Sequence, residues 1–499
     1  MLRWVLAFPA IALPLLVGGV YPWFWGGVAG LFFMAAPFFL LRQQLKGKPD
    51  RKTFFLVAFF LLYPFFQSVP LPLSWLEILS PERWAWIEEA RSLAGVQASA
   101  APLSYVPLET FFGGIWWAFL AFYGLVLRHF IQDRENLGWL VQVLFLWTVV
   151  EAAYGLLQVL VPGLGVLWHD PVGFQGQDFA RGTFIYHNHF AAYLNLMWPP
   201  MLASVLALSG PGASPSRAPL SPSELEKKRQ ATHKRIFKGF LLMLTLLALV
   251  FSMSRAGIAV SLVVLTLFIL LEGVRQRGLL AFAGVCWLGA VAYGILIGFH
   301  KLFLRFTQLA ESAPGRLRIW QDTLGIVKDH WAFGVGLDGY APAIKIYQTH
   351  LPDTLRLVHA HNDYLELAAE LGAPVALGLV ACAWGYWIKW VLRFARVRGK
   401  LPRERRLMAA GTLSALAGFY LHGLVEFNWA LPANQLAFVV VWTTAVTVLE
   451  RPKVRVRRRK QAPSSAPPFP DEPLAKDARW AGRPASPSRL GKTASRSPR

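Results

Sequence analysis

Residues 239–272 read GFLLMLTLLALVFSMSRAGIAVSLVVLTLFILLE, an almost unbroken apolar run. As a single α-helix this run would be roughly 50 Å long at 1.5 Å per residue, well beyond a hydrocarbon core of about 30 Å. The polar tetrad Ser254-Arg255-Ala256-Gly257 interrupts the run. We therefore predict two short membrane-crossing helices joined by a turn that carries Arg255. Apolar and polar residues do not alternate here, which excludes the strands of a membrane barrel.

The composition places the rest of the chain in the same class. Hydrophobic residues make up 55% of the 499 residues and charged residues only 16%. Apolar runs that approach the ~20 residues needed to cross a bilayer predict an all-α integral membrane protein with about twelve transmembrane helices. The predicted spans are 4–20, 23–41, 53–69, 111–127, 137–160, 189–208, 239–253, 257–272, 279–300, 366–392, 407–424 and 433–449.

The net charge of +22 lies mainly in short connectors between these spans and in the tail. Short loops rich in Lys and Arg stay in the cytoplasm, which predicts a multi-pass topology with both termini cytoplasmic. Basic segments at a membrane surface bind anionic headgroups, so we expect membrane lipids as partners and no nucleic acid. The basic connectors are 42–52, 128–136, 227–235, 275–277 and 393–406.

Three regions follow from this topology. Residues 1–179 form N-terminal transmembrane helices, and 180–450 form a second membrane region with a long, partly helical outer loop at 301–361. The tail at 451–499 is basic and rich in Pro and Ser, so it cannot bury a core and is predicted to be disordered in the cytoplasm.

Four polar clusters are predicted to reach the same outer face. They occupy 180–194, 252–257, 316–340 and 359–372. The third is predicted to be an amphipathic helix that ends at a Gly-Val-Gly turn. Ionisable groups at a membrane boundary cost free energy, so such clusters indicate a site.

The residue types in these clusters suit transfer of a group from a phosphate leaving group. Arg181, Arg255, Arg316 and Arg318 offer guanidinium groups, which donate paired hydrogen bonds to phosphate oxygens without losing charge. Histidine is the side chain best suited to accept a proton near neutral pH. The outer face has no ATP, so the donor would have to be an activated, lipid-linked molecule.

Simpler interpretations of several residues stay open. Arg316 and Arg318 could form a solvated face of a loop helix. His187 and His189 could sit in an interfacial aromatic belt.

Two further interpretations concern the histidines in the C-terminal half of the chain. His359, His361 and Asp363 are spaced i, i+2, i+4 and could converge on a metal, but no second cluster completes a set, so we expect neither a metal nor a cofactor. His422 and Glu426 are spaced i, i+4 and could be a pair on one helix face.

The clusters, in this order, resemble the O-antigen ligase and O-antigen polymerase superfamily of bacterial membrane glycosyltransferases. The resemblance covers roughly 180–435. It rests on GTFIYHNHFAAYL (182–194), SRAG (254–257), RIWQDTLGIVKDHWAFGVGLDGY (318–340), HAHNDYLELAAELG (359–372) and HGLVEFNWALPANQ (422–435).

The resemblance implies a GT-C-like architecture in the bacterial inner membrane, with the active site at the periplasmic face of the 180–450 region. It implies transfer of a glycan from an undecaprenyl-diphosphate carrier to a glycan or glycolipid acceptor such as lipid A–core, without metal or nucleotide and with inversion. The alternative is a polymerase that joins lipid-linked repeat units. In ligases the motif is His-Asn, nine residues, then Gly-x-x-[Gly/Thr/Tyr]; here His361-Asn362 and Gly372 fit, but the last position is Val375.

Carried over by position, the resemblance makes His361 the general base, and Arg255 and Arg318 the clamp on the leaving diphosphate. The substrate-binding candidates beside them are Arg181, Asn188, Arg316, His359, Asn362 and Asp363.

Two functions from other classes are less well supported. A polysaccharide transporter would need polar residues near the middle of several spans, and the sequence offers few beyond Glu151 and Gln158. A noncatalytic scaffold would depend on the basic tail to recruit partners.

Overall fold

The computed structural model describes part of the chain at the level of secondary structure. The described residues are 2–40, 51–95, 97–161, 163–167, 179–208, 221–273, 281, 284, 285, 288, 309–352 and 354–450. Within them the regular secondary structure is helical, except for one small antiparallel sheet in which β1 (Leu71–Pro72) pairs with β2 (Ala100–Ala101). The predicted all-α class is confirmed for these residues.

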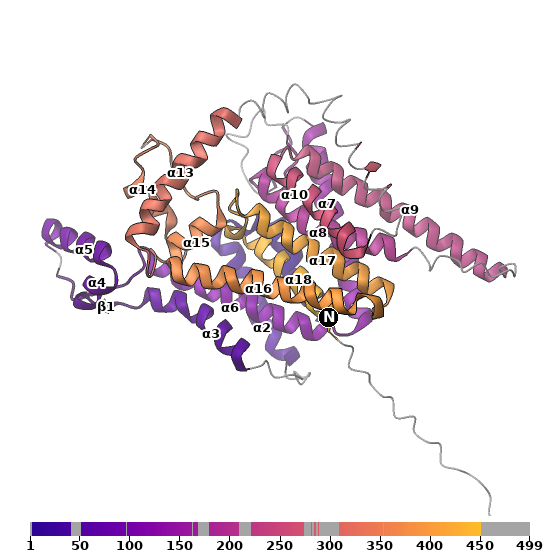
Figure 1. Ribbon diagram of the computed structural model, residues 1–499, viewed down its shortest axis with the longest axis horizontal. Helices are drawn as coiled ribbons and strands as arrows, with labels where there is room; N and C mark the ends of the chain where they lie inside the picture. The colour runs from indigo at the N-terminus through magenta and orange to yellow at the C-terminus, as the bar shows by residue number, and fades with distance from the viewer. Residues whose placement is uncertain are drawn as a thin grey trace, which may run out of the picture. The chain divides into compact units, whose positions relative to one another are not determined.

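Figure 1 shows the helices in their order along the chain. The α-helices are α1 (Leu2–Leu15), α2 (Pro22–Leu40), α3 (Arg51–Ser68), α4 (Leu73–Leu79), α5 (Pro81–Ala94), α6 (Pro107–Phe130), α7 (Arg134–Leu160), α8 (His187–Ala207), α9 (Pro222–Phe251), α10 (Arg255–Glu272), α13 (Leu309–Asp329), α14 (Tyr340–Tyr347), α15 (Asp363–Leu371), α16 (Ala373–Val397), α17 (Arg403–His422) and α18 (Pro432–Leu449). Short 3-10 turns are η1 (Val17–Gly19), η3 (Arg398–Lys400) and η4 (Asn428–Ala430).

Six of the described helices are long and apolar enough to cross a membrane. They are α6, α7, α8, α10, α16 with η3, and α18. This agrees with a membrane protein that spans the bilayer several times, while twelve crossings stay a prediction. The predicted span 279–300 lies outside the described residues apart from 281, 284, 285 and 288, and the predicted tail 451–499 lies wholly outside them.

The predicted break inside the long apolar run is confirmed. Helix α9 ends at Phe251 and α10 begins at Arg255. Met253 between them has a left-handed φ of 54°, and the Ser254 side chain caps α10 by accepting a hydrogen bond from the Gly257 amide at 3.1 Å. Since a serine cap satisfies an otherwise unpaired amide at a helix start, the polar tetrad both ends one helix and begins the next.

Two predicted boundaries are wrong. The basic segment 227–235 is the first half of α9, not a connector, and Figure 1 shows this half extending beyond the bundle. The predicted span 366–392 is two helices, because Gly372 at φ 79° separates α15 from α16. A Cβ at this glycine would lie 2.6 Å from the Ala332 carbonyl oxygen, so the break also lets a loop approach closely.

Helix α8 lies at the centre of the main hydrophobic core. Nearly all of its residues are buried, including Phe190 and Trp198, and it packs on α17 most extensively. Gly411 of α17 allows this approach, because a Cβ there would lie 2.7 Å from the Pro199 carbonyl oxygen. Helix α8 also packs against α9 and α10, the two helices that flank the polar cluster at 252–257.

Helices α13, α14 and α15 form a second, smaller core beside the bundle (Figure 1). As predicted, α13 ends before the Gly-Val-Gly segment, at Asp329. The segment 331–336 then hydrogen-bonds the end of α15, since the amides of Val335 and Gly336 donate to Ala369 and Glu370 at 2.9 and 3.0 Å. These bonds satisfy carbonyls that a helix end leaves unpaired, and so they fix α15 and the residues before it.

Gly334 is a position in this junction that leaves no room for a side chain. Its φ is 71°, and an added Cβ would lie 2.2 Å from the Glu370 carbonyl oxygen. We expect Gly334→Ala to lower the unfolding free energy by about 1–3 kcal/mol or more, since strain and a backbone clash add. The measurement is thermal unfolding of the detergent-solubilised protein. Gly138→Ala on α7, where nothing lies within 4 Å, is the control and should unfold at or above the wild-type temperature.

Candidate active site around Glu426

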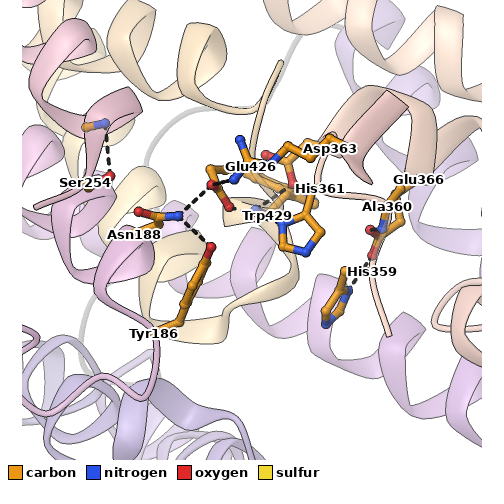
Figure 2. A network of polar contacts seen from close by, with 12 residues as sticks. Tyr186, Asn188, Ser254, His359, Ala360, His361, Asp363, Glu366, Glu426 and Trp429 are labelled. Atoms are coloured by element: carbon orange, nitrogen blue, oxygen red, sulfur yellow. Dashed lines mark hydrogen bonds and ion pairs between the residues drawn. The ribbon is translucent and has the colours of Figure 1, made fainter. Parts of the chain in front are cut away.

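A buried carboxylate lies where the polar clusters meet. The Glu426 side chain, in the segment between α17 and α18, is fully buried. Its Oε1 accepts hydrogen bonds from Asn188 Nδ2 at 2.6 Å and from an Arg316 guanidinium nitrogen at 2.5 Å. His361 Nδ1 lies 3.5 Å from its Oε2. Figure 2 shows Asn188 between Glu426 and Tyr186, whose hydroxyl accepts from the same amide at 2.6 Å.

The charges around Glu426 keep it ionised. Burial by itself would raise the pKa of this carboxyl, but the neighbouring His361 imidazole and the Arg316 guanidinium outweigh burial and hold the pKa below its ordinary value. An ionised carboxylate at this depth requires such partners. Glu426 therefore supplies a fixed negative charge directly behind His361.

His361 is held in an unusual backbone conformation. Its φ is 51°, a left-handed value that non-glycine residues adopt at a cost of order 1–3 kcal/mol. The next residue, Asn362, caps α15 by accepting from the amides of Tyr364 and Leu365 at 3.0 and 3.1 Å. The cap fixes the chain immediately after the imidazole. The imidazole itself stays 28% exposed, so an incoming group can reach it.

Phe427 organises the imidazoles into one aromatic cluster. The His359 ring stacks on Phe427 with centroids 4.2 Å apart, and His361 meets the same ring edge-on at 4.8 Å. His189 also contacts it edge-on, at 4.5 Å. Tyr186 lies parallel to the Phe427 ring at 5.8 Å. Packing against a common ring fixes the distances between these side chains.

His359 and Asp363 each have a partner of their own. His359 Nδ1 lies 2.7 Å from Glu366 Oε1, and the other oxygen of Glu366 accepts from the Ala360 amide at 2.7 Å (Figure 2). Burial lowers the pKa of His359, but the Glu366 carboxylate more than offsets this and raises it. Asp363 accepts from the Trp429 amide at 2.9 Å. Among the described residues, no group of three or more His, Cys, Asp or Glu side chains is arranged to hold a metal ion.

The turn before α10 packs against the beginning of α8. His187 Nδ1 lies 2.7 Å from the Ser252 carbonyl oxygen. Asn195 Nδ2 donates to the Gly257 carbonyl at 2.8 Å. Half-buried Arg255 therefore belongs to the same region as Asn188, and Figure 2 shows Ser254 on the Asn188 side of the cluster.

The other three predicted arginines differ in burial and in what they contact. Arg316 donates a hydrogen bond to the buried Glu426 carboxylate, so it is not simply a solvated residue of a loop helix. Arg318 lies two residues further along α13 and is exposed, next to buried Ile319. Arg181 is buried before α8, where its amide donates to Gln158 Oε1 at 3.1 Å. The structure thus brings Asn188, Arg316 and His361 into direct contact with one carboxylate and leaves Arg318 open to solvent.

The central residue of the site is one that the sequence analysis assigned differently. Glu426 and His422 were interpreted as a possible pair on one helix, but α17 ends at His422, so Glu426 lies beyond that helix. The signal was present, because Glu426 is the one acidic residue of the quoted stretch HGLVEFNWALPANQ. Phe427 and Tyr186 gave no such signal, since aromatic residues are common near membrane interfaces.

The chain was compared with known protein families. Residues 240–380 match the family model described as O-Antigen ligase. The matched segment contains Arg255, Arg316, Arg318 and His361, while Asn188 and Glu426 lie outside it. The resemblance drawn from the sequence motifs is confirmed. No curated protein sequence matches the chain significantly.

The Arg316–Glu426 pair provides a test of the site's electrostatics. We expect a double-mutant cycle with Arg316→Ala and Glu426→Gln to give a coupling free energy of about 1.5–3 kcal/mol, because a hydrogen bond to a buried charge is strong. The measurement is unfolding by denaturant titration in mixed micelles.

The exposed pair Arg134–Glu404, with side chains 84% and 57% exposed, is the matched control. The cycle with Arg134→Ala and Glu404→Gln should give less than about 1 kcal/mol. Equal coupling in the two cycles would show that burial of Glu426 adds nothing to its interaction with Arg316.

Proposed function

We propose, from the O-antigen ligase domain at residues 240–380, that this membrane protein transfers a glycan from an undecaprenyl-diphosphate carrier to a glycan or glycolipid acceptor. The observation that carries the proposal is the convergence of Asn188, Arg316 and His361 on the buried Glu426. In this proposal the site faces the periplasm, in the bacterial inner membrane, and both termini are cytoplasmic.

His361 acts as the general base in the proposed reaction. Nδ1 lies 3.5 Å from Glu426 Oε2, and the negative charge there favours a proton on Nδ1. In this proposal the neutral imidazole therefore carries its proton on Nδ1, and Nε2 accepts one. The acceptor hydroxyl attacks the anomeric carbon of the donor sugar while its proton passes to Nε2. Glu426 stabilises the imidazolium that results, as a carboxylate behind a catalytic histidine does.

The leaving group determines what the arginines do. As the new C–O bond forms, the bond between the anomeric carbon and the diphosphate oxygen breaks, and undecaprenyl diphosphate departs with the electron pair. Arg255 and Arg318 stabilise that growing negative charge; Arg318 is exposed and so can meet a ligand. Direct displacement inverts the anomeric configuration and needs no metal.

The remaining predicted residues position these groups. Asn362 holds His361 through the cap on α15, and Asn188 and Arg316 hold Glu426. His359 and Asp363 lie beside the acceptor, and Arg181 supports the segment before α8.

The first test is transfer by the reconstituted protein. We expect His361→Ala to reduce the rate about 10²–10⁴-fold, because a general base is lost. Arg255→Ala should reduce the rate about 10²–10³-fold through loss of charge stabilisation. The assay follows transfer from a defined undecaprenyl-diphosphate glycan in liposomes. His233→Ala and Arg229→Ala, both on the exposed half of α9, should transfer at the wild-type rate. Undiminished transfer in both site variants would refute the mechanism.

A second test separates ligase from polymerase. In cells that depend on this protein, we expect the His361→Ala variant to accumulate glycan of normal length on the lipid carrier, as loss of a ligase would. Accumulation of single repeat units instead would identify a polymerase. The measurement is electrophoresis of the lipid-linked glycans.

A further inference from the structure

A cavity of about 540 Å³ opens beside His359. Its walls come from α2, α6, the beginning of α14, α15 and the segment 429–435. This volume lies within the range of about 300–1,000 Å³ that is usual for small-ligand sites. Of its lining, the proposed reaction uses His359 and Asp363.

Five carboxyl groups lie in the lining of the cavity. They are Glu109, Asp338, Asp363, Glu366 and Glu370, and among the described lining residues there is no Lys or Arg. Asp363, Glu366 and Glu370 accept hydrogen bonds from the surrounding protein, whereas Glu109 and Asp338 are exposed. His359, bonded to Glu366, is the one cationic candidate in the lining.

The described lining carries five carboxyl groups against one imidazole, so it favours neutral or cationic ligands over anions. Burial raises the pKa of Asp363 and of Glu370 well above the usual range, which favours the neutral, hydrogen-bond-donating form of both carboxyls. Asp338 is open to the cavity, but the surrounding protein still limits the hydration of its carboxyl and, with the nearby Glu366, raises its pKa to about 6, so its ionised form predominates above that pH. A wall with both donor and acceptor carboxyls suits hydroxyl groups, which both donate and accept.

Two local features of the backbone place Asp338 in this wall. Its φ is 63°, a left-handed value for a residue other than glycine. On the facing helix α6, Gly113 leaves room for it, since a Cβ there would lie 2.7 Å from Asp338 Oδ2. Any other residue at position 113 would displace the carboxyl.

Four tryptophans contribute to the apolar part of the surface. Trp25, Trp116, Trp117 and Trp429 line the cavity, and the Trp25 and Trp116 rings lie 5.4 Å apart. Indole faces pack against apolar C–H surfaces, and sugars present such a face together with hydroxyl groups at their edges. Aromatic faces beside carboxyls are therefore suited to a pyranose ring.

The cavity adjoins the proposed base but not the proposed clamp. His359 lines the cavity and stacks on Phe427, which His361 contacts edge-on. The donor sugar carries a diphosphate and requires cations, which the lining does not supply. The acceptor presents a hydroxyl to His361 and needs no phosphate there.

We infer that this cavity binds the acceptor, through a pyranose residue that carries no negative charge. The inference rests on the proposed glycosyl transfer for the name of its ligand. Neutral and amino-substituted sugars fit the wall, whereas a uronic acid or a phosphorylated sugar is repelled by it.

The test measures sugar binding without a donor. Saturation-transfer NMR on the full-length protein in micelles at pH 7.5 compares three probes built on the same pyranose ring: methyl glucoside, methyl glucosaminide and methyl glucuronide. We expect the neutral and amino probes to bind and the glucuronide to bind at least tenfold more weakly. Trp25→Ala should weaken the two bound probes, and Asp338→Asn should reduce the discrimination against glucuronide. Trp75→Ala, whose residue is 60% exposed on α4, is the control and should change none of the three.

Equal binding of glucuronide and glucoside, binding of no probe, or identical binding in wild type, Trp25→Ala and Asp338→Asn would overturn the inference. Thermal unfolding of each variant shows whether it is folded. Because no donor is present, failure here leaves glycosyl transfer and the role of His361 untouched. If instead the wild-type protein bound these sugars but transferred no glycan from the undecaprenyl-diphosphate donor, the proposed function would be contradicted and the binding result would stand.

Discussion

The arrangement of the site depends on one constraint, which is that the ionised Glu426 carboxylate is fully buried. Such a group is stable only if hydrogen-bond donors and positive charge surround it. Here they come from the beginning of α8, from α13 and from the segment before α15. Satisfying one carboxylate therefore ties the smaller core of α13–α15 to the central helix of the bundle. The same interaction places an imidazole at the surface of the cluster.

Backbone strain gathers at the same place. Among the described residues, left-handed φ values at non-glycine positions occur at Val17, Met253, Asp338 and His361. Three of these four adjoin the proposed site: one in the turn before Arg255, one in the cavity wall and one at the proposed base. Strained residues persist only where the surrounding structure holds them, and they are common at functional sites. The capping bonds of Ser254 and Asn362 provide that support locally.

The site separates charges of opposite sign. Arg255 and exposed Arg318 suit an anionic leaving group, whereas the cavity beside His359 is lined with carboxyls and tryptophans. The aromatic cluster around Phe427 lies between His359 and His361. Two substrates with different charge could thus be kept apart and still meet at one imidazole, which is what transfer between a diphosphate donor and a hydroxyl acceptor requires.

Local patterns in the sequence determined the helical membrane class, the break at residues 254–257 and the helix that ends before Gly-Val-Gly, because hydrophobic runs, caps and glycines act over a few residues. They also pointed to His361 and Arg255 through the family motifs. They did not show that α15 and α16 separate at Gly372, since the reason is a close approach to Ala332 in another segment. Only the tertiary structure decided that Glu426 is the centre of the site and that Arg316 serves it. Asn188 and Arg316 lie 238 and 110 residues from Glu426 along the chain. No local pattern encodes which distant side chains will hydrogen-bond to the same buried carboxylate.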